Sequence, residues 1–156
     1  MYDNKKRILF VCLGNICRSP MAEEILRAKA KEAGIEVQVD SAGLIDYHEG
    51  EFPDPRMRHH AHLHGYNLTH RSRPITVGDF HRFDIIVGMD TNNIRQLMRL
   101  APDSESRNSI VLATQYLCTI DADTVPDPYY GGDSDFEYVI TLLEDIADGL
   151  LSSLVE

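Results

Sequence analysis

Tryptophan is absent from this sequence, cysteine occurs three times, and no long apolar run is present. An odd number of cysteines makes a poor disulfide framework, so the fold must depend on its core rather than on cross-links. No stretch approaches the about eighteen apolar residues of a membrane helix, which predicts no membrane insertion. The basic start of the chain, residues 1–7, is followed by too short an apolar run for a signal peptide. The protein is therefore expected to be cytoplasmic, where thiols stay reduced.

Positive charge is also in short supply, since 15 Lys and Arg residues stand against 25 Asp and Glu residues. The formal net charge is -10 at pH 7. Proteins that bind nucleic-acid backbones carry a basic excess, so nucleic acid is not expected as a partner. Any bound anion must instead be held by local geometry. At 156 residues, 43% of them hydrophobic, the chain is long enough for one domain with its own core, spanning residues 1–156.

Apolar runs alternate with helical patterns along the chain. The continuous run at residues 8–11 is typical of a strand buried on both faces of a parallel sheet. Residues 35–39 alternate between apolar and polar side chains, which indicates an edge strand. Two further apolar runs lie at residues 83–87 and 110–112. The alternation of strands and helices predicts an α/β fold with a mostly parallel sheet.

Local end signals delimit the helices between these strands. Ser19 followed by Pro20 predicts a helix N-cap, and Gly34 predicts the end of the same helix. The last helix is predicted to begin with a capping box made by Ser134 and Glu137, and its apolar residues then follow helical spacing. Two more helices are expected at residues 55–64 and 91–100.

The short loop after the first strand concentrates reactive and anion-binding residue types. A loop that tolerates left-handed backbone at Gly14 and Asn15, followed by a helix N-terminus, forms a ring of N–H groups that can bind a phosphate. Arg18 adds a bidentate cation, and the same field stabilises a thiolate at Cys12. A thiolate that faces a bound phosphoryl group is a nucleophile placed for attack at phosphorus. Five residues separate Cys12 from Arg18, namely Leu13, Gly14, Asn15, Ile16 and Cys17.

Other interpretations of these residue types fit the sequence less well. A zinc site is not favoured, because four residues separate Cys12 from Cys17 and no second cysteine pair exists. A P-loop NTPase needs Gly-Lys-Ser at its helix start, whereas this chain has Cys-Arg-Ser at residues 17–19. A thioredoxin-like site has two residues between its cysteines, whereas four separate Cys12 from Cys17. Cys118 is predicted to be an ordinary buried cysteine. The histidines at 59, 60, 62 and 64 include an i,i+4 pair but no carboxylate at a telling position, so a polar helix is favoured over a metal site.

A long segment between the last strand and the last helix, residues 121–135, is rich in aspartate, proline, glycine and tyrosine. Long structureless loops in small domains are usually functional or disordered. Most of these aspartates are expected to be solvated. Asp127 differs, because Pro126 and Pro128 restrict the backbone on both sides and so aim its side chain. The pattern predicts a positioned acid at Asp127.

The motifs VCLGNICRSPMAE at residues 11–23 and DPYYGGDSDFE at 127–137 resemble those of the low-molecular-weight protein tyrosine phosphatases. The resemblance covers essentially the whole chain in order. It implies a single-domain, four-stranded parallel sheet of order 2-1-3-4, with helices on both faces and a phosphate-binding loop after strand 1. Shorter matches lie between the two motifs: DSAG at 40–43, PDPR at 53–56, HGYNLTHRSR at 64–73 and FDIIVGMD at 83–90.

The resemblance also implies a role for each site residue. Cys12 would attack phosphorus and form a phosphocysteine, while Arg18 and the loop amides hold the equatorial oxygens. Asp127 would protonate the leaving group and then activate water. Ser19 would hydrogen-bond the thiolate and ease its departure. A supporting network that holds the loop would consist of Asn15, Ser41 and His70, and no metal or organic cofactor is implied.

The substrate that the resemblance implies is phosphotyrosine in proteins, together with small aryl phosphates. Tyr47 would form one wall of the substrate cleft, with Tyr129 and Tyr130 opposite, so that a phenyl ring is sandwiched between them. A deep aromatic cleft favours phosphotyrosine over phosphoserine, because only the longer side chain reaches the loop. The loop residues 13–17 and Ser19 would contact the phosphate. Phosphate, vanadate and sulfate are expected as active-site anions.

Two other functions remain as alternatives. An arsenate reductase shares this fold and loop, but it needs two further cysteines, and beyond the loop the chain has only Cys118. A non-catalytic phosphotyrosine-binding module would be expected to lack Cys12, Arg18 or Asp127, and all three are present. The second thiol in the loop suggests a redox role, because Cys17 lies close enough in sequence to form a disulfide with an oxidised Cys12.

Overall fold

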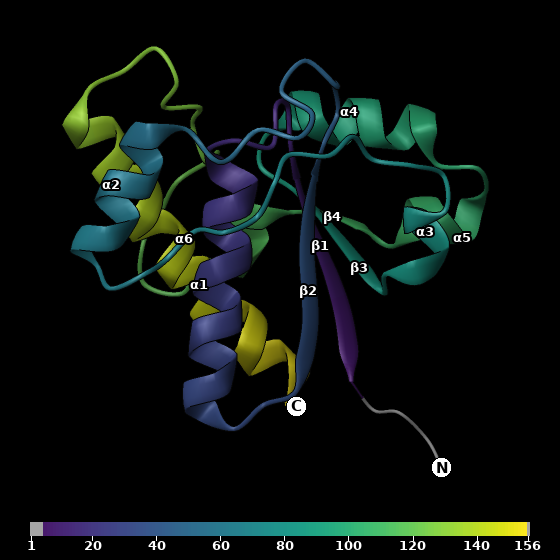
Figure 1. The fold of residues 1–156 in the computed structure, drawn as a ribbon. Coiled ribbons are helices and arrows are strands. Elements are labelled where there is room, and N and C mark those ends of the chain that lie inside the picture. Colours follow the sequence, from purple (N-terminus) through teal and green to yellow (C-terminus); the bar gives the residue numbers. More distant parts are fainter. Residues whose placement is uncertain (1–4, 156) are drawn as a thin grey trace.

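A four-stranded parallel sheet forms the centre of the molecule, with strand order β2-β1-β3-β4 (Figure 1). This arrangement confirms the predicted α/β class and strand order. The structure is a computed structural model that describes residues 5–155, so the first four residues of the basic N-terminus lie outside it. The strands are β1 (Lys6–Cys12), β2 (Val37–Gly43), β3 (Ile85–Gly88) and β4 (Ile110–Leu112).

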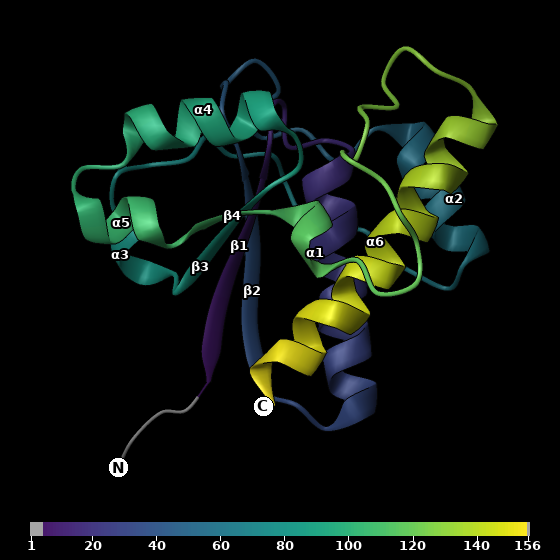
Figure 2. The same ribbon diagram turned by 180° about the vertical axis from the view of Figure 1, so that it is seen from behind.

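Helices cover both faces of this sheet, as Figure 2 shows from the opposite side to Figure 1. Alternate residues of β1 supply the two cores: Ile8 and Phe10 pack toward α1 and α6, whereas Leu9 and Val11 pack toward α3 and α4. None of the helices in residues 5–155 combines the length and apolar content needed to cross a bilayer. The helices are α1 (Arg18–Ala33), α2 (Pro55–Leu63), α3 (Asp79–Arg82), α4 (Thr91–Leu100), α5 (Ser104–Asn108), the 3-10 turn η1 (Ala113–Tyr116) and α6 (Asp133–Leu154).

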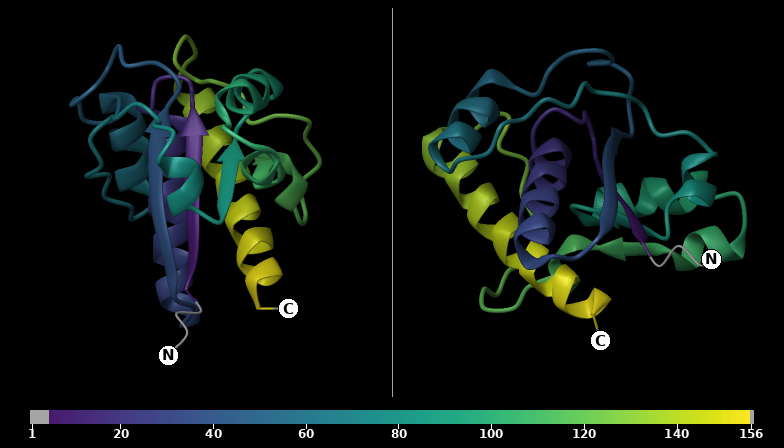
Figure 3. Two further views of the ribbon diagram at one scale, coloured as in Figure 1. Left: turned by 90° about the vertical axis from the view of Figure 1, so that its right-hand side faces the viewer. Right: turned by 60° about the horizontal axis from the view of Figure 1, so that its bottom comes forward.

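The parallel register brings the carboxyl ends of β1 and β2 to one end of the molecule. Cys12, the last residue of β1, lies opposite Gly43, the last residue of β2. The arrowheads of both strands point to the end where the loops 13–17 and 44–54 gather (Figure 3). Ligands of parallel α/β sheets bind at this end, because the loops that follow the strands converge there.

Several predicted element ends are wrong, each for a local reason. β2 begins two residues later than predicted and continues to Gly43, because it pairs with the whole of β1. Cys17, not Ser19, is the N-cap of α1, and the Ser19 hydroxyl points into the candidate site instead. α6 begins at Asp133, where the Asp135 carboxylate accepts the N–H of Gly132 at 2.8 Å, so Ser134 and Glu137 do not form the capping box. The end of α1 is confirmed, since Gly34 adopts φ 70°.

Cys118 is exposed, which corrects the prediction that it is buried. It follows η1 on a turn that Asp145 of α6 anchors, with one Asp145 oxygen 2.8 Å from the Cys118 amide nitrogen. Gly149 of α6 lets the end of η1 approach the helix closely, because a Cβ at position 149 would lie 1.8 Å from the Tyr116 carbonyl oxygen. The turn is thus fixed against α6 by backbone N–H groups that donate to the Asp145 carboxylate, and the Cys118 sulfur lies 3.8 Å from the Asp145 carbonyl oxygen.

A histidine–carboxylate cluster joins α2 to α6. The buried His60 ring has Nδ1 2.6 Å from Glu137 Oε2 and Nε2 3.1 Å from Asp133 Oδ1. His64 Nε2 lies 2.7 Å from the other oxygen of Glu137. No carboxylate near His60 in sequence marks this cluster, because its partners lie 73 and 77 residues further along the chain. Hydrogen bonds from these histidines therefore hold α2 against α6.

We expect His60→Gln to destabilise the protein in a pH-dependent way. Both ring nitrogens of His60 face carboxylates, which favours the imidazolium. Burial lowers the pKa of His60, but the hydrogen bonds to Glu137 and Asp133 outweigh this and raise the pKa above its ordinary value. The stabilisation is therefore complete below about pH 6.5 and is lost as the pH rises through the raised value.

Thermal unfolding of both proteins from about pH 6 to about pH 9 measures this effect. At the acidic end, His60→Gln should lower Tm by roughly 6 °C, corresponding to about 2 kcal/mol. The difference should shrink at the alkaline end. The exposed His62 on the same helix supplies the control, and His62→Gln should leave Tm unchanged. A Tm difference for His60→Gln that is constant with pH would show that the ring acts only by packing.

Candidate active site

The loop 13–17 turns sharply between β1 and α1. β1 ends at Cys12 and α1 begins at Arg18, so the loop must close within five residues. Asn15 has φ 57°, a left-handed conformation that asparagine tolerates better than most residues. This confirms the expected left-handed backbone at Asn15 but not at Gly14, whose φ is not positive. The turn needs space as well: a Cβ on Gly43 would lie 3.1 Å from both the Asn15 Cβ and the Leu13 carbonyl oxygen.

The fully buried Asn15 side chain is held by four hydrogen bonds. Its amide nitrogen donates to Ser19 Oγ at 2.7 Å and to Ser41 Oγ at 3.0 Å. Its oxygen accepts the backbone N–H of Arg73 at 3.0 Å and lies 2.9 Å from His70 Nε2. The structure thus brings together the predicted supporting residues. Because every polar atom of the amide has a partner, the left-handed turn at Asn15 has one well-defined geometry.

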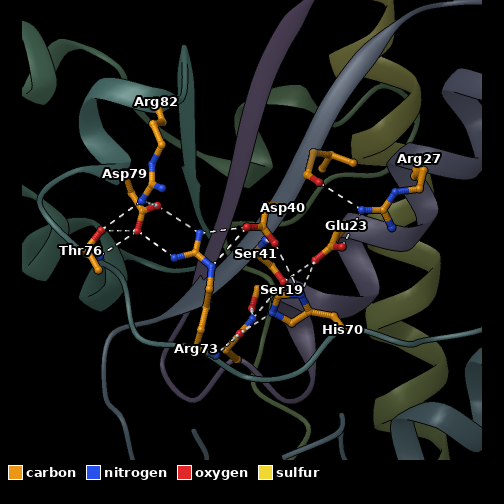
Figure 4. Close-up of polar contacts among 12 residues, drawn as sticks. Ser19, Glu23, Arg27, Asp40, Ser41, His70, Arg73, Thr76, Asp79 and Arg82 are labelled. Atoms are coloured by element: carbon orange, nitrogen blue, oxygen red, sulfur yellow. Dashed lines mark hydrogen bonds and ion pairs between the residues drawn. The ribbon is translucent and has the colours of Figure 1, made fainter. Parts of the chain in front are cut away.

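Charged residues that the sequence analysis missed extend this network (Figure 4). Glu23 accepts the Ser41 hydroxyl at 2.6 Å and lies 3.2 Å from His70 Nδ1. Arg73 then bridges Asp40 and Asp79, with a nitrogen 3.0 Å from each carboxylate. The members come from α1, β2, α3 and the intervening loops, so no local sequence pattern marks them.

A metal could in principle be held by part of this network, because ligand atoms of Glu23, Asp40 and His70 lie within 4.8 Å of one another. The two carboxylates already have cationic partners, however. Arg27 lies 2.6 Å from Glu23, and Arg73 lies 3.0 Å from Asp40. The donor set is therefore satisfied by arginine and histidine, and it supports the loop without requiring an ion.

The Cys12 sulfur lies at the floor of the site, buried at the end of β1. Its Sγ is 3.0 Å from Ser19 Oγ. Because Ser19 Oγ already accepts a hydrogen bond from Asn15, its own proton is free to point at the sulfur. A hydroxyl that donates to sulfur favours a thiolate, and the network around Asn15 therefore extends to the Cys12 sulfur.

The Arg18 guanidinium is buried, and its position is fixed by partners in the segments that follow β3 and η1. Nη1 donates to Asp90 Oδ2 at 2.7 Å and to the Val125 carbonyl at 3.0 Å. Nη2 lies 3.7 Å from Asp127 Oδ2. Asp90 was missed by the sequence analysis, although it is also the N-cap of α4. Its charge holds the arginine in place before any ligand arrives.

Cys17 differs sharply from Cys12 in its environment. Burial and the nearby negative charge of Asp54 raise the pKa of the Cys17 thiol far above its ordinary value. Cys17 is therefore a protonated thiol that packs under the loop. Both cysteines are free thiols in this structure.

A cleft of about 300 Å³ opens above the loop. Tyr47 and Tyr130 are strongly exposed at its rim, with 81% and 95% of their surface accessible. The rings of Tyr129 and Tyr130 meet edge to face at 4.9 Å. Ile45 and His48 also line the cleft and were not anticipated from the sequence. The lining residues are Cys12, Leu13, Gly14, Ile16, Cys17, Arg18, Ile45, Tyr47, His48, Asp127, Tyr129 and Tyr130.

Asp127 lies on the segment 126–132, and its half-exposed carboxylate reaches the cleft. One of its oxygens accepts the Tyr129 N–H at 3.1 Å, which orients the carboxyl group. The segment is in turn anchored by α2, because Arg56 Nη2 donates to the Tyr129 carbonyl at 2.8 Å. A buried cysteine sulfur, a fixed cation and an oriented carboxyl group thus meet in one aromatic-walled cleft.

The sequence of this chain matches a known protein family over almost its whole length. The sequence profile described as low molecular weight phosphotyrosine protein phosphatase matches residues 7–156. The chain belongs to this family. Members are cysteine-dependent phosphatases, so the protein is an enzyme, and neither an arsenate reductase nor a non-catalytic binding module is favoured.

Relatives of the low molecular weight phosphotyrosine protein phosphatase family match over most of their length. The Streptomyces coelicolor low molecular weight protein-tyrosine-phosphatase is 43% identical over 155 residues, covering 96% of this chain and 94% of the relative. The pig enzyme is 42% identical over 137 residues, covering 86% of each. The crystal structure of an Entamoeba histolytica protein tyrosine phosphatase with Hepes in its active site is 39% identical, with a TM-score of 0.94 and 97% of each chain covered. A Drosophila arginine phosphatase is 31% identical, with a TM-score of 0.88 and coverage of 94% and 96%.

Proposed function

We propose that this protein hydrolyses phosphotyrosine through a phosphocysteine intermediate formed on Cys12. The observation that carries the proposal is the shared cleft: Cys12 and Arg18 at its floor, and Asp127 on its wall. The Cys12 thiolate attacks phosphorus, so that an S–P bond forms while the bond from phosphorus to the phenolic oxygen breaks. Arg18 and the N–H groups of residues 13–17 hold the three equatorial oxygens, where the transition-state charge lies.

Asp127 serves as general acid and then as general base. It gives its proton to the departing phenolic oxygen in the first step. In the second step it accepts a proton from water, which attacks phosphorus as the S–P bond breaks and the thiolate returns. The hydroxyl of Ser19, 3.0 Å from the sulfur, stabilises the thiolate as leaving group. The network around Asn15, Ser41 and His70 holds the loop in the geometry that these steps need.

The aromatic walls support phosphotyrosine as the substrate class. Tyr47 lies on one wall and Tyr129 with Tyr130 on the other, so a phenyl ring is stacked while its phosphate reaches the loop. A shorter phosphoserine side chain cannot span the cleft. Because one structural relative is an arginine phosphatase, phosphoarginine is the comparison to make. Hydrolysis of matched phosphotyrosine, phosphoserine and phosphoarginine peptides should show kcat/KM highest for phosphotyrosine, and equal values would overturn the substrate proposal.

We also propose which anions inhibit the enzyme, that it needs no cofactor, and where in the cell it acts. The anions phosphate, vanadate and sulfate should bind the loop and inhibit competitively, in keeping with a relative that holds the sulfonate buffer Hepes in its active site. Activity should persist in a chelator, because the residues 12–18 and Asp127 supply the chemistry without metal or organic cofactor. We further propose that the chain acts as a single domain, in the cytoplasm, where its thiols stay reduced.

We also propose that Cys17 protects Cys12 during oxidation. Peroxide oxidises the Cys12 thiolate to a sulfenic acid and is itself reduced to water, and the Cys17 thiol then forms a disulfide with release of water. Cys12 and Cys17 both line the cleft, at the two ends of the turn between β1 and α1, and this arrangement supports the proposal. After peroxide and then dithiothreitol, wild type should recover most of its activity, whereas Cys17→Ser should recover only a small part. Full recovery of the variant would leave Cys17 with a packing role alone.

A further inference from the structure

One stretch of this acidic chain carries arginines and histidines without any acidic residue between them. Residues 55–73 contain four arginines, five histidines and no aspartate or glutamate. The whole chain has 25 acidic residues and a net charge of -10. A cationic stretch in such a chain stands out electrostatically, because the rest of the surface repels the anions that this stretch attracts.

Both ends of this stretch lie beside the phosphate-binding loop. At the start of α2, the Asp54 N–H donates to the Ile16 carbonyl at 2.8 Å. At the other end, the Ser72 hydroxyl donates to the Gly14 carbonyl at 3.0 Å. The wall loop 44–54 lies between them, since Arg71 Nη1 donates to the Gly50 carbonyl at 3.1 Å. The cationic stretch therefore borders the cleft on the side of Tyr47.

Two arginines of this stretch gather on one exposed aromatic ring. The Arg71 guanidinium lies 4.2 Å from the centre of the Phe52 ring, and that of Arg58 lies 5.2 Å from it. Phe52 has 44% of its surface exposed. We name Arg58, Phe52 and Arg71 the arginine platform. Stacking on the ring restricts both guanidinium groups, so less conformational freedom is lost when they bind an anion.

The arginine platform lacks internal neutralisation. Within residues 5–155, neither Arg58 nor Arg71 forms an ion pair with a carboxylate. Their neighbours differ, because Arg56 pairs with Asp54 at 2.9 Å and Arg73 pairs with Asp40 and Asp79. Glu51, which lies next to Phe52 in sequence, is engaged by His48. Two like charges held on one ring without a counter-ion favour an incoming carboxylate.

We propose that the arginine platform binds acidic side chains that flank the phosphotyrosine of a substrate, so that acidic phosphotyrosine peptides are preferred. The proposal rests on the proposed function and names its substrate class. Phe52 lies four residues from His48 in the cleft wall, so their Cα atoms are at most about 15 Å apart. An extended peptide covers this distance with about four residues. A long polyanion or an anionic membrane is disfavoured, because an extended anion would also face the acidic remainder of a surface with net charge -10, whereas a short peptide can stay at the arginine platform.

Peptide kinetics test the platform directly. One phosphotyrosine peptide carries glutamate at the four positions on each side, and its partner carries glutamine there. Wild type should show a kcat/KM about fivefold higher for the glutamate peptide, mainly through KM, and added salt should reduce the ratio. The double variant Arg58→Gln, Arg71→Gln should bring the ratio close to one. Its activity toward para-nitrophenyl phosphate should be unchanged, because that substrate has no flanking residues.

A matched control separates local from general charge effects. Arg95 and Arg99 lie on α4, on the other face of the sheet, and replacing both with glutamine removes the same charge. This variant should keep the wild-type peptide ratio. A platform variant that retains the ratio, or a control that loses it equally, would overturn the proposal. Preferential binding of wild type to vesicles of anionic lipid, with no difference between the two peptides, would also overturn it.

Binding measurements keep this test independent of turnover. Fluorescence anisotropy of the two labelled peptides is measured with Cys12→Ser, with and without the platform substitutions. The glutamate peptide should bind about fivefold tighter, and the platform substitutions should remove the difference. If the wild-type enzyme hydrolyses no aryl phosphate, the proposed function fails, while the peptide preference in binding still stands or falls by itself.

Discussion

Replacing Cys12 with serine should abolish turnover of aryl phosphates while leaving a folded protein that still binds phosphate or vanadate. A serine hydroxyl is a far poorer nucleophile at neutral pH, and the expected loss in kcat is on the order of 10⁴-fold or more. The anion site should survive, because its N–H groups belong to the backbone of residues 13–17. Arg18 also stays in place, because its partners are Asp90 and Val125 rather than Cys12.

Steady-state hydrolysis of para-nitrophenyl phosphate measures the loss, and a thermal shift on adding vanadate measures anion binding. Cys118→Ser is the matched control, since Cys118 is an exposed residue beside α6 that is not part of the cleft lining. The control should keep full activity. Substantial turnover by Cys12→Ser would refute the assignment of Cys12 as nucleophile.

Replacing Asp127 with asparagine should produce a loss that depends on the leaving group. For phenols of high pKa the loss should be about 10²-fold to 10³-fold, because the departing oxygen needs a proton. For nitrophenols, which leave readily as anions, the loss should be small. The asparagine amide also removes the negative charge 3.7 Å from Arg18 Nη2, so phosphate binding should strengthen slightly.

A series of substituted phenyl phosphates measures this dependence as the slope of log kcat/KM against leaving-group pKa. The slope should be shallow for wild type and steep for Asp127→Asn. Asp121→Asn alters an exposed aspartate of the longer segment 121–135 and should match wild type at every leaving group. If Asp127→Asn lowered the rate equally across the series, the general acid would have to be another residue.

The predicted fold and loop came from residues that are contiguous in sequence. The apolar run at 8–11 and the five residues between Cys12 and Arg18 form one strand and one turn, so local rules describe them well. The tyrosines of the cleft and the support of Asn15 by Ser41 and His70 were implied by resemblance, and the structure brings these residues together. Their catalytic roles stay predictions until the variants are measured.

The residues that escaped prediction act across long sequence separations. Asp90 holds Arg18 from 72 residues away, and Asp40 lies 33 residues from its partner Arg73. Nothing in the neighbourhood of either aspartate distinguishes it from a solvated carboxylate. The predicted bounds of β2 and the predicted start of α6 are wrong for a related reason. Strand length depends on the partner strand, and the cap of α6 depends on which of several nearby acids reaches Gly132.

The close approach of Gly43 to Asn15 has a consequence for how such enzymes can diversify. The floor of the cleft is tied to the register of β1 and β2, because a Cβ at Gly43 would lie only 3.1 Å from Asn15 Cβ and the Leu13 carbonyl oxygen and would crowd the turn. The walls are not tied in this way: Tyr47 and Tyr130 come from surface loops and pack little against the core. Mutation can therefore exchange wall residues freely while the floor is inherited unchanged. New substrate ranges should arise by drift in the segments 44–54 and 126–132, with the chemistry conserved beneath them.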